Sequence, residues 1–483
     1  MKTIKTRIVL MGRNSVLLKN TLIISIGKIC TQLITYLLLP IYTAVLSTSE
    51  YGTIDLLITY IMLISPVITI QMESSIFRFL IDARGNRHEI TRIITNCIAC
   101  TAAPSLAFAL GFAIIAQSLN FEYTETFLAG VLTNSILSIA LQIARGLGDN
   151  MTYAVGSAIA GILTVLLNIV LVIIWPFGVS GMLYSTAIAQ FLAVIYILYK
   201  DKVFTYIDSA SLSKQLMKKM AGYSAPLILN GLSWWIISAS DRTIVSAFIG
   251  TEANGILAVA TKFSAIVANV FVIFNLSWTE SVALHIKDND RDNYISDITN
   301  RCFNLFSSCG IILIMVCAVF FKYLVNENFL AAFPLIPLLV VGGIINVIQT
   351  LYGIIYIGLK DTKKVSQTSF IAAIINLIVC IALVKIIGLY AAAISTIVAM
   401  LYLAIYRYTD INRTMNIKLR MKDIAIILIA YGVFMILYWI NNTYINIAGL
   451  FISIIATVIW NKTMVKGILS ICNSQLRKMF PVH

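Results

Sequence analysis

Charged residues are scarce in this chain. Asp, Glu, Lys and Arg make up only 12% of its 483 residues, whereas about 25% is usual in soluble proteins. Hydrophobic residues account for 59%, which is more than a soluble protein of this length could bury. The composition therefore excludes an aqueous globular protein and predicts a membrane protein.

Residues that commonly carry catalysis or bind metals are also few. The three histidines, His88, His285 and His483, lie too far apart for metal-ligand spacing. The chain has no GxxxxGKS or GxxxxGKT loop for binding ATP, and no Ser-His-Asp arrangement can be argued from its residues. We therefore expect no enzymatic activity, no metal site and no cofactor.

Long apolar stretches recur along the chain. Each is long enough to cross a hydrocarbon core about 30 Å thick as a helix and too long to be a barrel strand. The pattern predicts an all-α polytopic membrane protein with about fourteen transmembrane helices. The expected spans are residues 20–46, 51–80, 91–118, 126–146, 152–175, 180–199, 221–249, 253–280, 297–321, 331–358, 366–386, 389–407, 423–440 and 445–461.

The basic residues are distributed unevenly between the two sides of these spans. Most of the 35 Lys and Arg residues fall in the two tails or in the even-numbered connections, counting from an N-terminus on the inside. Several turns on the opposite side are acidic, with Glu50, Glu122 and Glu252 among their residues. This is the positive-inside pattern, so we expect both termini in the cytoplasm and no nucleic-acid partner.

The chain also resembles itself at a nearly constant offset of about 203 to 212 positions. The matched segments are 47–52 with 250–255, 146–149 with 358–361, Asn168 with Asn376, and Gly178, Ser185 and Thr186 with Gly388, Ser395 and Thr396. Six spans therefore occur twice, and both copies have the same orientation because an even number of spans precedes the second. We expect an N-terminal six-helix lobe over 1–199, a cytoplasmic linker over 200–220, a second lobe over 221–410, and an appended helix pair with a tail over 411–483.

Several of these segments also resemble a known family. They are Leu39-Pro40 leading to Ser47–Gly52, Arg145–Asp149, Asp241-Arg242 followed by Gly250, and the stretch from Asn376 to Gly388. As a set they are similar to the polysaccharide transporter branch of the multidrug, oligosaccharidyl-lipid and polysaccharide exporter superfamily, which includes the O-antigen flippases. Twelve spans are commonest among O-antigen members. Fourteen expected spans therefore leave open a closer relationship to the lipid II flippases or to the larger polysaccharide exporters.

The resemblance implies both an architecture and a cargo. Two six-helix lobes would surround a central cavity that opens alternately to each side of a bacterial inner membrane. The cargo would be an undecaprenyl-diphosphate-linked oligosaccharide, such as an O-antigen repeat unit, moved from the cytoplasmic to the periplasmic leaflet. Membrane lipid and polysaccharide assembly proteins, such as a polymerase and a chain-length regulator, are the implied partners.

Ionisable groups inside the spans are candidates for this transport because a charge there costs at least about 2.5 to 3.5 kcal/mol on insertion scales. Lys28, Arg242 and Lys262 lie inside expected spans and would offset the charge of a diphosphate. Three structural alternatives stay open: Asp241 and Arg242 could form a structural ion pair with neighbouring helices, Lys28 could reach the inner interface, and Asp55, close to the outer turn, could be merely interfacial. Asp55, Glu73 and Asp241 are the carboxylates available for coupling to an ion gradient.

Aromatic and amide side chains inside the spans are candidates for contacts with the sugar, although packing or anchoring at the interface explains many such residues. These candidates are Gln32, Tyr36, Trp234, Trp235, Asn269, Trp278, Asn346 and Gln349.

Two other functions remain open at this stage. A multidrug or small-cation exporter on the same fold predicts a cavity dominated by carboxylates, whereas Lys28, Arg242 and Lys262 are basic. A membrane polysaccharide polymerase or ligase needs a sizeable periplasmic loop for its chemistry, and the expected outer connections are short. Both features favour the flippase.

Overall fold

The computed structural model describes residues 38–359 and 361–462, and every regular element in these ranges is helical. Twelve helices within them are long and apolar enough to cross a membrane. The all-α polytopic prediction is confirmed, whereas the count of fourteen is not: span 20–46 lies largely outside the described residues, and span 221–249 falls in a helix that is not among the twelve.

The chain forms two compact units that divide between Trp235 and Ile236. The elements of the first unit are α2 Leu39–Val45, α3 Thr48–Ile68, α4 Met72–Ala83, α5 Arg87–Ser118, α6 Thr124–Leu147, α7 Asn150–Asn168, η1 Ile169–Ile174, α8 Gly178–Lys200, η2 Val203–Tyr206 and η3 Ser209–Ser211. Helix α9, Lys214–Phe248, crosses the boundary. The elements of the second unit are α10 Thr251–His285, α11 Arg291–Leu324, η4 Glu327–Leu335, α12 Ile336–Gly358, α13 Thr362–Ile387, α14 Tyr390–Ile411, α15 Met421–Ile440 and α16 Thr443–Trp460.

Helix α3 is shorter than the expected span 51–80. It begins with a capping box, in which Ser47 and Glu50 satisfy each other's backbone N–H groups. It ends at Ile68, and α4 starts only at Met72. Between them Ile70 and Gln71 have φ values of +55° and +48°, which a continuing right-handed helix does not allow. The span is therefore broken into two helices.

The first unit is packed around α4. Met72, Ile76 and Leu80 are completely buried and form one cluster with residues of α5, α6 and α9. Ser75 reinforces this packing because its hydroxyl donates to the carbonyl of Met220 at 3.1 Å. The segment after the α3–α4 break is therefore part of the core.

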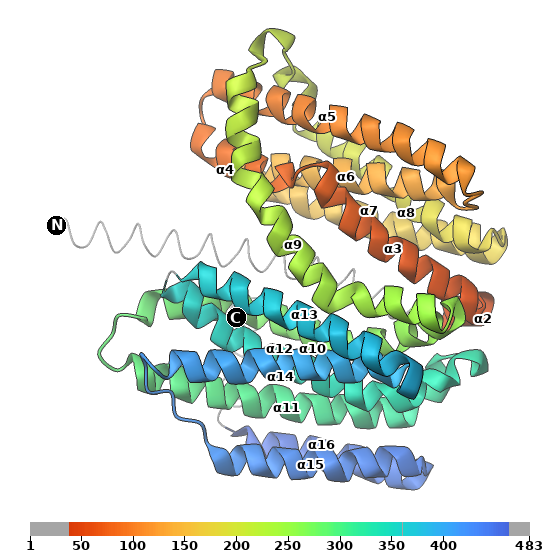
Figure 1. Ribbon diagram of the computed structural model, residues 1–483, viewed down its shortest axis with the longest axis vertical. Coiled ribbons are helices and arrows are strands. Elements are labelled where there is room, and N and C mark those ends of the chain that lie inside the picture. Colours follow the sequence, from red (N-terminus) through yellow and green to blue (C-terminus); the bar gives the residue numbers. More distant parts are fainter. Residues whose placement is uncertain (1–37, 360, 463–483) are drawn as a thin grey trace, which may run out of the picture. The chain divides into compact units, whose positions relative to one another are not determined.

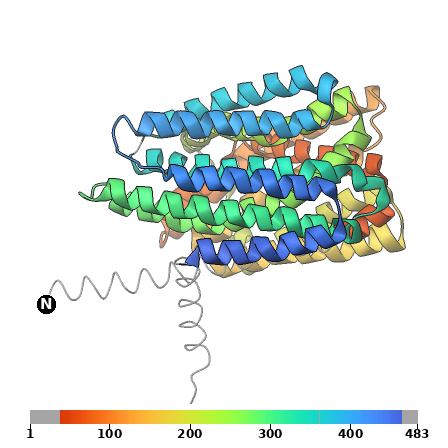
Figure 2. The ribbon, with the colours of Figure 1, turned by 90° about the horizontal axis from the view of Figure 1, so that it is seen from below.

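In the second unit, α10 to α14 lie side by side, and α15 and α16 run along α11 (Figures 1 and 2). Two tyrosines fix the last helix pair: the Tyr431 hydroxyl donates to the Ser307 carbonyl at 2.9 Å, and the Tyr438 hydroxyl donates to the Phe333 carbonyl at 2.7 Å. Bonds of this kind are favoured in a bilayer because no water is there to replace them.

Candidate functional site

The second unit holds a buried polar cluster on α9, α13 and α14. Asp241 is 8% exposed, and its Oδ2 accepts a hydrogen bond of 3.4 Å from the Thr396 hydroxyl. Its Oδ1 is buried and has no hydrogen-bond partner among the described residues. An unsatisfied carboxylate oxygen at this depth is costly, so it marks a place where a cation or a proton would bind.

An amide and two further hydroxyls continue this cluster. The Ser240 hydroxyl donates to Oδ1 of Asn376 at 3.2 Å, and Nδ2 of Asn376 donates to the Ser395 hydroxyl at 3.4 Å. Asn376 and Ser395 are both fully buried. We call Ser240, Asp241, Asn376, Ser395 and Thr396 the Asp241 cluster. Carboxylate, amide and hydroxyl oxygens are the ligand types that hard cations prefer.

The first unit has a polar cavity beside the α3–α4 break. Its volume is about 210 Å³, and Ser65, Thr69, Glu73, Asn134 and Ser138 are among its lining residues. The Thr69 hydroxyl donates to Oε2 of Glu73 at 3.0 Å. The break in the helix therefore places one carboxylate at a cavity large enough for water.

The third expected carboxylate, Asp55, is half-buried on α3. It lies about four turns of helix before the break, so α3 does not bring it next to Glu73. Of the three candidates for ion coupling, Asp241 has the most enclosed polar surroundings.

The candidates for diphosphate binding are described only in part. Lys28 lies outside the described residues, as do Gln32 and Tyr36. Arg242 on α9 and Lys262 on α10 both belong to the second unit, and both side chains are half-buried. Arg242 directly follows Asp241, so a positive charge accompanies the Asp241 cluster along α9.

The candidates for sugar contacts fall into two groups. Trp234, Asn269 and Asn346 are half-buried. Trp235, Trp278 and Gln349 form hydrogen bonds within the protein. The Trp235 indole donates to the Thr59 carbonyl at 3.0 Å, the Trp278 indole donates to the Leu351 carbonyl at 3.4 Å, and Nε2 of the completely buried Gln349 donates to Oδ1 of Asn346 at 2.5 Å.

The buried partner of Gln349 is Arg407, a residue that sequence reasoning missed. Arg407 is 1% exposed on α14, and its guanidinium donates to Oε1 of Gln349 at 2.6 Å and to the hydroxyls of Thr368 and Ser369 at 3.0 Å each. These neutral acceptors on α12 and α13 join three helices of the second unit. An Arg at the predicted cytoplasmic end of a span is normally expected to be exposed. No feature of the sequence therefore indicated that the Arg407 side chain is buried.

Comparison with known proteins identifies the family. A profile described as "Polysaccharide biosynthesis protein" matches residues 17–278, which is more than half of the chain. The chain belongs to this family. A search of curated proteins finds no match.

Solved structures show that this polysaccharide biosynthesis protein shares the exporter superfamily fold. The lipid II flippase MurJ in an inward closed conformation is similar over 94% of this chain and all of that chain, with a TM-score of 0.71 and 15% identity. An inward-facing multidrug resistance MATE transporter of the same superfamily covers 80% of this chain and 98% of its own, with a TM-score of 0.66 and 13% identity. The resemblance read from the sequence is confirmed.

Proposed function

We propose that this protein is a flippase that moves an undecaprenyl-diphosphate-linked oligosaccharide from the cytoplasmic to the periplasmic leaflet of a bacterial inner membrane by alternating access. The observation that carries the proposal is a chain of the polysaccharide biosynthesis family with a fold similar to that of a lipid II flippase. The polyprenyl tail stays in the bilayer, and both termini lie in the cytoplasm. The oligosaccharide is an O-antigen or related repeat unit, delivered to a polymerase and its chain-length regulator.

Basic side chains bind the diphosphate headgroup in this mechanism. A diphosphate is costly to bury alone, and Lys28, Arg242 and Lys262 offset that cost. The Arg242 guanidinium can hold two phosphate oxygens at once, whereas a lysine acts as a point charge that can follow a moving ligand. Tyr36, Trp234, Asn269 and Asn346 contact the sugars.

The Asp241 cluster supplies the energy coupling. Its carboxylate binds a monovalent cation or a proton, with neutral oxygens from Asn376, Ser395 and Thr396 around it. Occupancy of the cluster neutralises Asp241 and therefore changes the local field on the adjacent Arg242. Loading and release of the ion would bias the two conformations of the protein by this difference.

The connections on the predicted outer side agree better with transport than with polymer chemistry. Among the described residues the longest of them is segment 325–335, which contains η4. A polymerase or ligase would need more residues there to hold a sugar acceptor. Drug export remains the alternative that the fold similarity to MATE transporters supports.

The proposal is tested by deleting the gene in its own host and measuring surface polysaccharide together with lipid-linked oligosaccharide in the inner membrane. We expect polymer to disappear and the lipid-linked intermediate to accumulate. Lys262→Ala should reproduce both effects at normal protein levels, whereas Lys287→Ala, which removes an exposed lysine beyond the same helix, should not. Normal polymer in the deletion strain, combined with new drug sensitivity, would contradict the flippase and favour export.

A further inference from the structure

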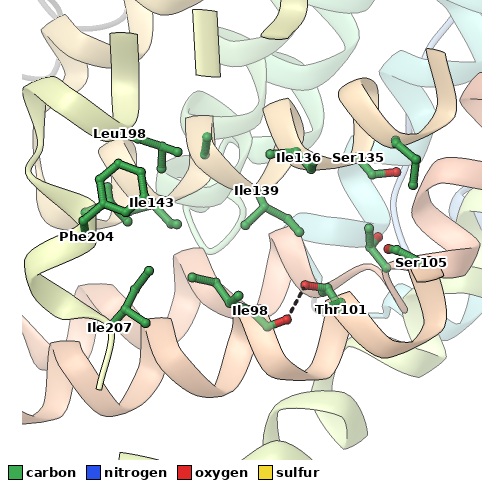
Figure 3. A pocket seen from close by; sticks show the side chains of 15 residues that line it. Ile98, Thr101, Ser105, Ser135, Ile136, Ile139, Ile143, Leu198, Phe204 and Ile207 are labelled. Atoms are coloured by element: carbon green, nitrogen blue, oxygen red, sulfur yellow. Dashed lines mark hydrogen bonds between the residues drawn. The ribbon is translucent and has the colours of Figure 1, made fainter. Parts of the chain in front are cut away.

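An apolar cavity of the first unit lies between α5 and α6. Its volume is about 330 Å³. Ile98, Thr101 and Ser105 of α5 point toward Ser135, Ile136 and Ile139 of α6, and Phe204 and Ile207 lie at one end (Figure 3). None of the described residues assigned to transport lines this cavity.

The surface of the cavity is effectively apolar. The Thr101 hydroxyl donates to the Cys97 carbonyl at 2.9 Å, and the Ser135 hydroxyl donates to the Val131 carbonyl at 2.7 Å. Because these hydroxyl protons are used within their own helices, they offer little to water. A large apolar cavity of this kind stays dry and takes up hydrocarbon.

Helix α5 packs loosely against the rest of the first unit. Only 6% of its most apolar segment is buried, compared with 44% for α6. The cavity beside α5 is only partly enclosed by the described residues.

The segment after α8 closes one end of the cavity. The Tyr206 carbonyl accepts from the Thr95 hydroxyl at 3.1 Å, and the side chain of Asn96 donates to the Ser211 carbonyl at 2.9 Å and accepts from the Ser213 N–H at 2.7 Å. These bonds hold Phe204 and Ile207 against α5. The closed end lies where α5 begins and α8 ends, which is the predicted cytoplasmic side.

Exposed basic residues border this closed end. Lys200 and Lys202 flank the end of α8, and the Arg87 guanidinium lies 5.8 Å from the centre of the Tyr206 ring. Two neighbouring carboxylates bond locally: Asp149 accepts from Thr152, and Asp208 accepts from the Ala210 N–H and the Ser211 hydroxyl. A third, Asp201, is half-buried between Lys200 and Lys202 and lies beside Asp149. We call Arg87, Lys200 and Lys202 the basic rim.

We propose that this cavity binds an anionic phospholipid of the cytoplasmic leaflet, with one acyl chain between α5 and α6 and the phosphate at the basic rim. A partly enclosed apolar slot that ends at positive charge is complementary to such a lipid, and basic residues near the cytoplasmic leaflet attract anionic headgroups. The bound chain fills the space that the loose packing of α5 leaves. This site is separate from the transported substrate and does not depend on the flippase assignment.

The test uses the purified full-length protein in phosphatidylcholine vesicles that contain a little phosphatidylglycerol with a photoreactive acyl chain. We expect crosslinks on residues 98–105 and 132–143. Ala102→Trp fills the cavity, and labelling of these segments should fall roughly tenfold or more, because each excluded methylene weakens binding about fourfold. Ala103→Trp is the matched control, since residue 103 is exposed, does not line the cavity and points about 100° away around the helix.

The headgroup is tested by Arg87→Gln, Lys200→Gln and Lys202→Gln together. Labelling by phosphatidylglycerol should fall at least about fivefold, the effect of one such charge near an anionic surface, and labelling by a photoreactive phosphatidylcholine should not change. Lys287→Gln, Lys363→Gln and Lys422→Gln, which remove three exposed lysines of the second unit, are the control. Equal labelling of Ala102→Trp and Ala103→Trp, an unaffected basic-rim variant, or displacement by equimolar polyprenyl phosphate would each overturn the proposal.

Discussion

The two units differ at positions that the predicted internal repeat pairs with each other. In the first unit the side chain of Asn168 donates to the Tyr42 hydroxyl at 2.7 Å. In the second unit the equivalent Asn376 bonds to Ser240 and Ser395 instead. Both asparagines are buried, at 1% and 0% exposure. The two units therefore share a buried amide, but the residues that bond to it differ.

The second unit has a carboxylate, Asp241, in the cluster that contains its buried asparagine. The offset that matches Ser47 with Gly250 also matches Leu38 with Asp241, and the side chain of Leu38 is 6% exposed. The predicted repeat thus pairs a buried leucine with a buried carboxylate. We infer that one unit keeps this region as neutral packing, whereas the other has specialised it for a charge.

Replacing the buried carboxylate of Asp241 should have the largest effect on transport. Asp241→Leu makes the second unit resemble the first, and we expect gradient-driven transport to be lost completely in vesicles that carry lipid-linked oligosaccharide. Stability should stay the same or rise, because the change removes a buried carboxylate oxygen that lacks a partner. Transport at the normal rate would separate Asp241 from energy coupling, whereas a fall in thermal stability would show that the carboxylate is structural.

The reverse exchange tests whether the first unit tolerates a charge. Leu38→Asp should destabilise the protein by about 1 to 3 kcal/mol or more, because it puts a carboxylate in a place where a leucine is buried. The measurements are the yield of folded protein and its thermal unfolding. Leu38→Asn is the control, since it changes shape and polarity without full charge. If Leu38→Asp were as stable as Leu38→Asn, the two equivalent places would not differ in their tolerance of charge.

The shared asparagines should differ in what their loss affects. Asn168→Ala leaves the Tyr42 hydroxyl without its partner, which should cost about 1 to 3 kcal/mol of stability and leave the ion dependence of transport unchanged. Asn376→Ala should raise the ion concentration needed for half-maximal transport. Equal shifts in ion dependence for both variants would contradict the specialisation of the second unit.

The parts of this structure that sequence reasoning found are those fixed by hydropathy and by the repeat. Apolar length predicted the long helices, since a bilayer enforces helical hydrogen bonding on any segment that crosses it. The repeat and the buried-charge argument together picked out Asn376, Ser395, Thr396 and Asp241. The structure brings these four residues into one cluster on α9, α13 and α14.

Two features could not be found in this way. The break after α3 depends on left-handed conformations at Ile70 and Gln71, and neither residue type signals that geometry; Pro66 in the last turn of α3 is the one local hint. The burial of Arg407 depends on Gln349, Thr368 and Ser369 from two other helices. Local composition carries no information about such partners, which only tertiary packing brings together.

The predicted repeat also pairs Lys364 of the second unit with Thr152 of the first, so one unit has a cation where the other has none. We expect the smallest effect from exchanging these two residues. In the second unit Lys364 Nζ lies 2.7 Å from Asp410 and 3.8 Å from Asp361. The first unit has Thr152 at the position of Lys364, beside Asp149 and Asp201. Burial and the Asp149 carboxylate raise the pKa of Asp201 to about 6, whereas the backbone N–H of Thr152 lowers the pKa of Asp149.

The pH dependence of stability should expose this difference. Because the pKa of Asp201 is higher in the folded protein than its unfolded value of about 3.9, the folded state binds this proton more tightly, and the contribution of Asp201 to stability falls as the pH rises from about 4 to 6. Asp201→Asn should remove that fall in thermal scans at pH 4.5 and 6.5. Lys364→Thr is the mirror change: it should create a similar fall in the second unit by leaving Asp361 and Asp410 without their cation. The effect should be about 1 kcal/mol or less because the Lys364 side chain is 42% exposed. An unchanged pH profile in both variants would show that the missing cation does not distinguish the two units.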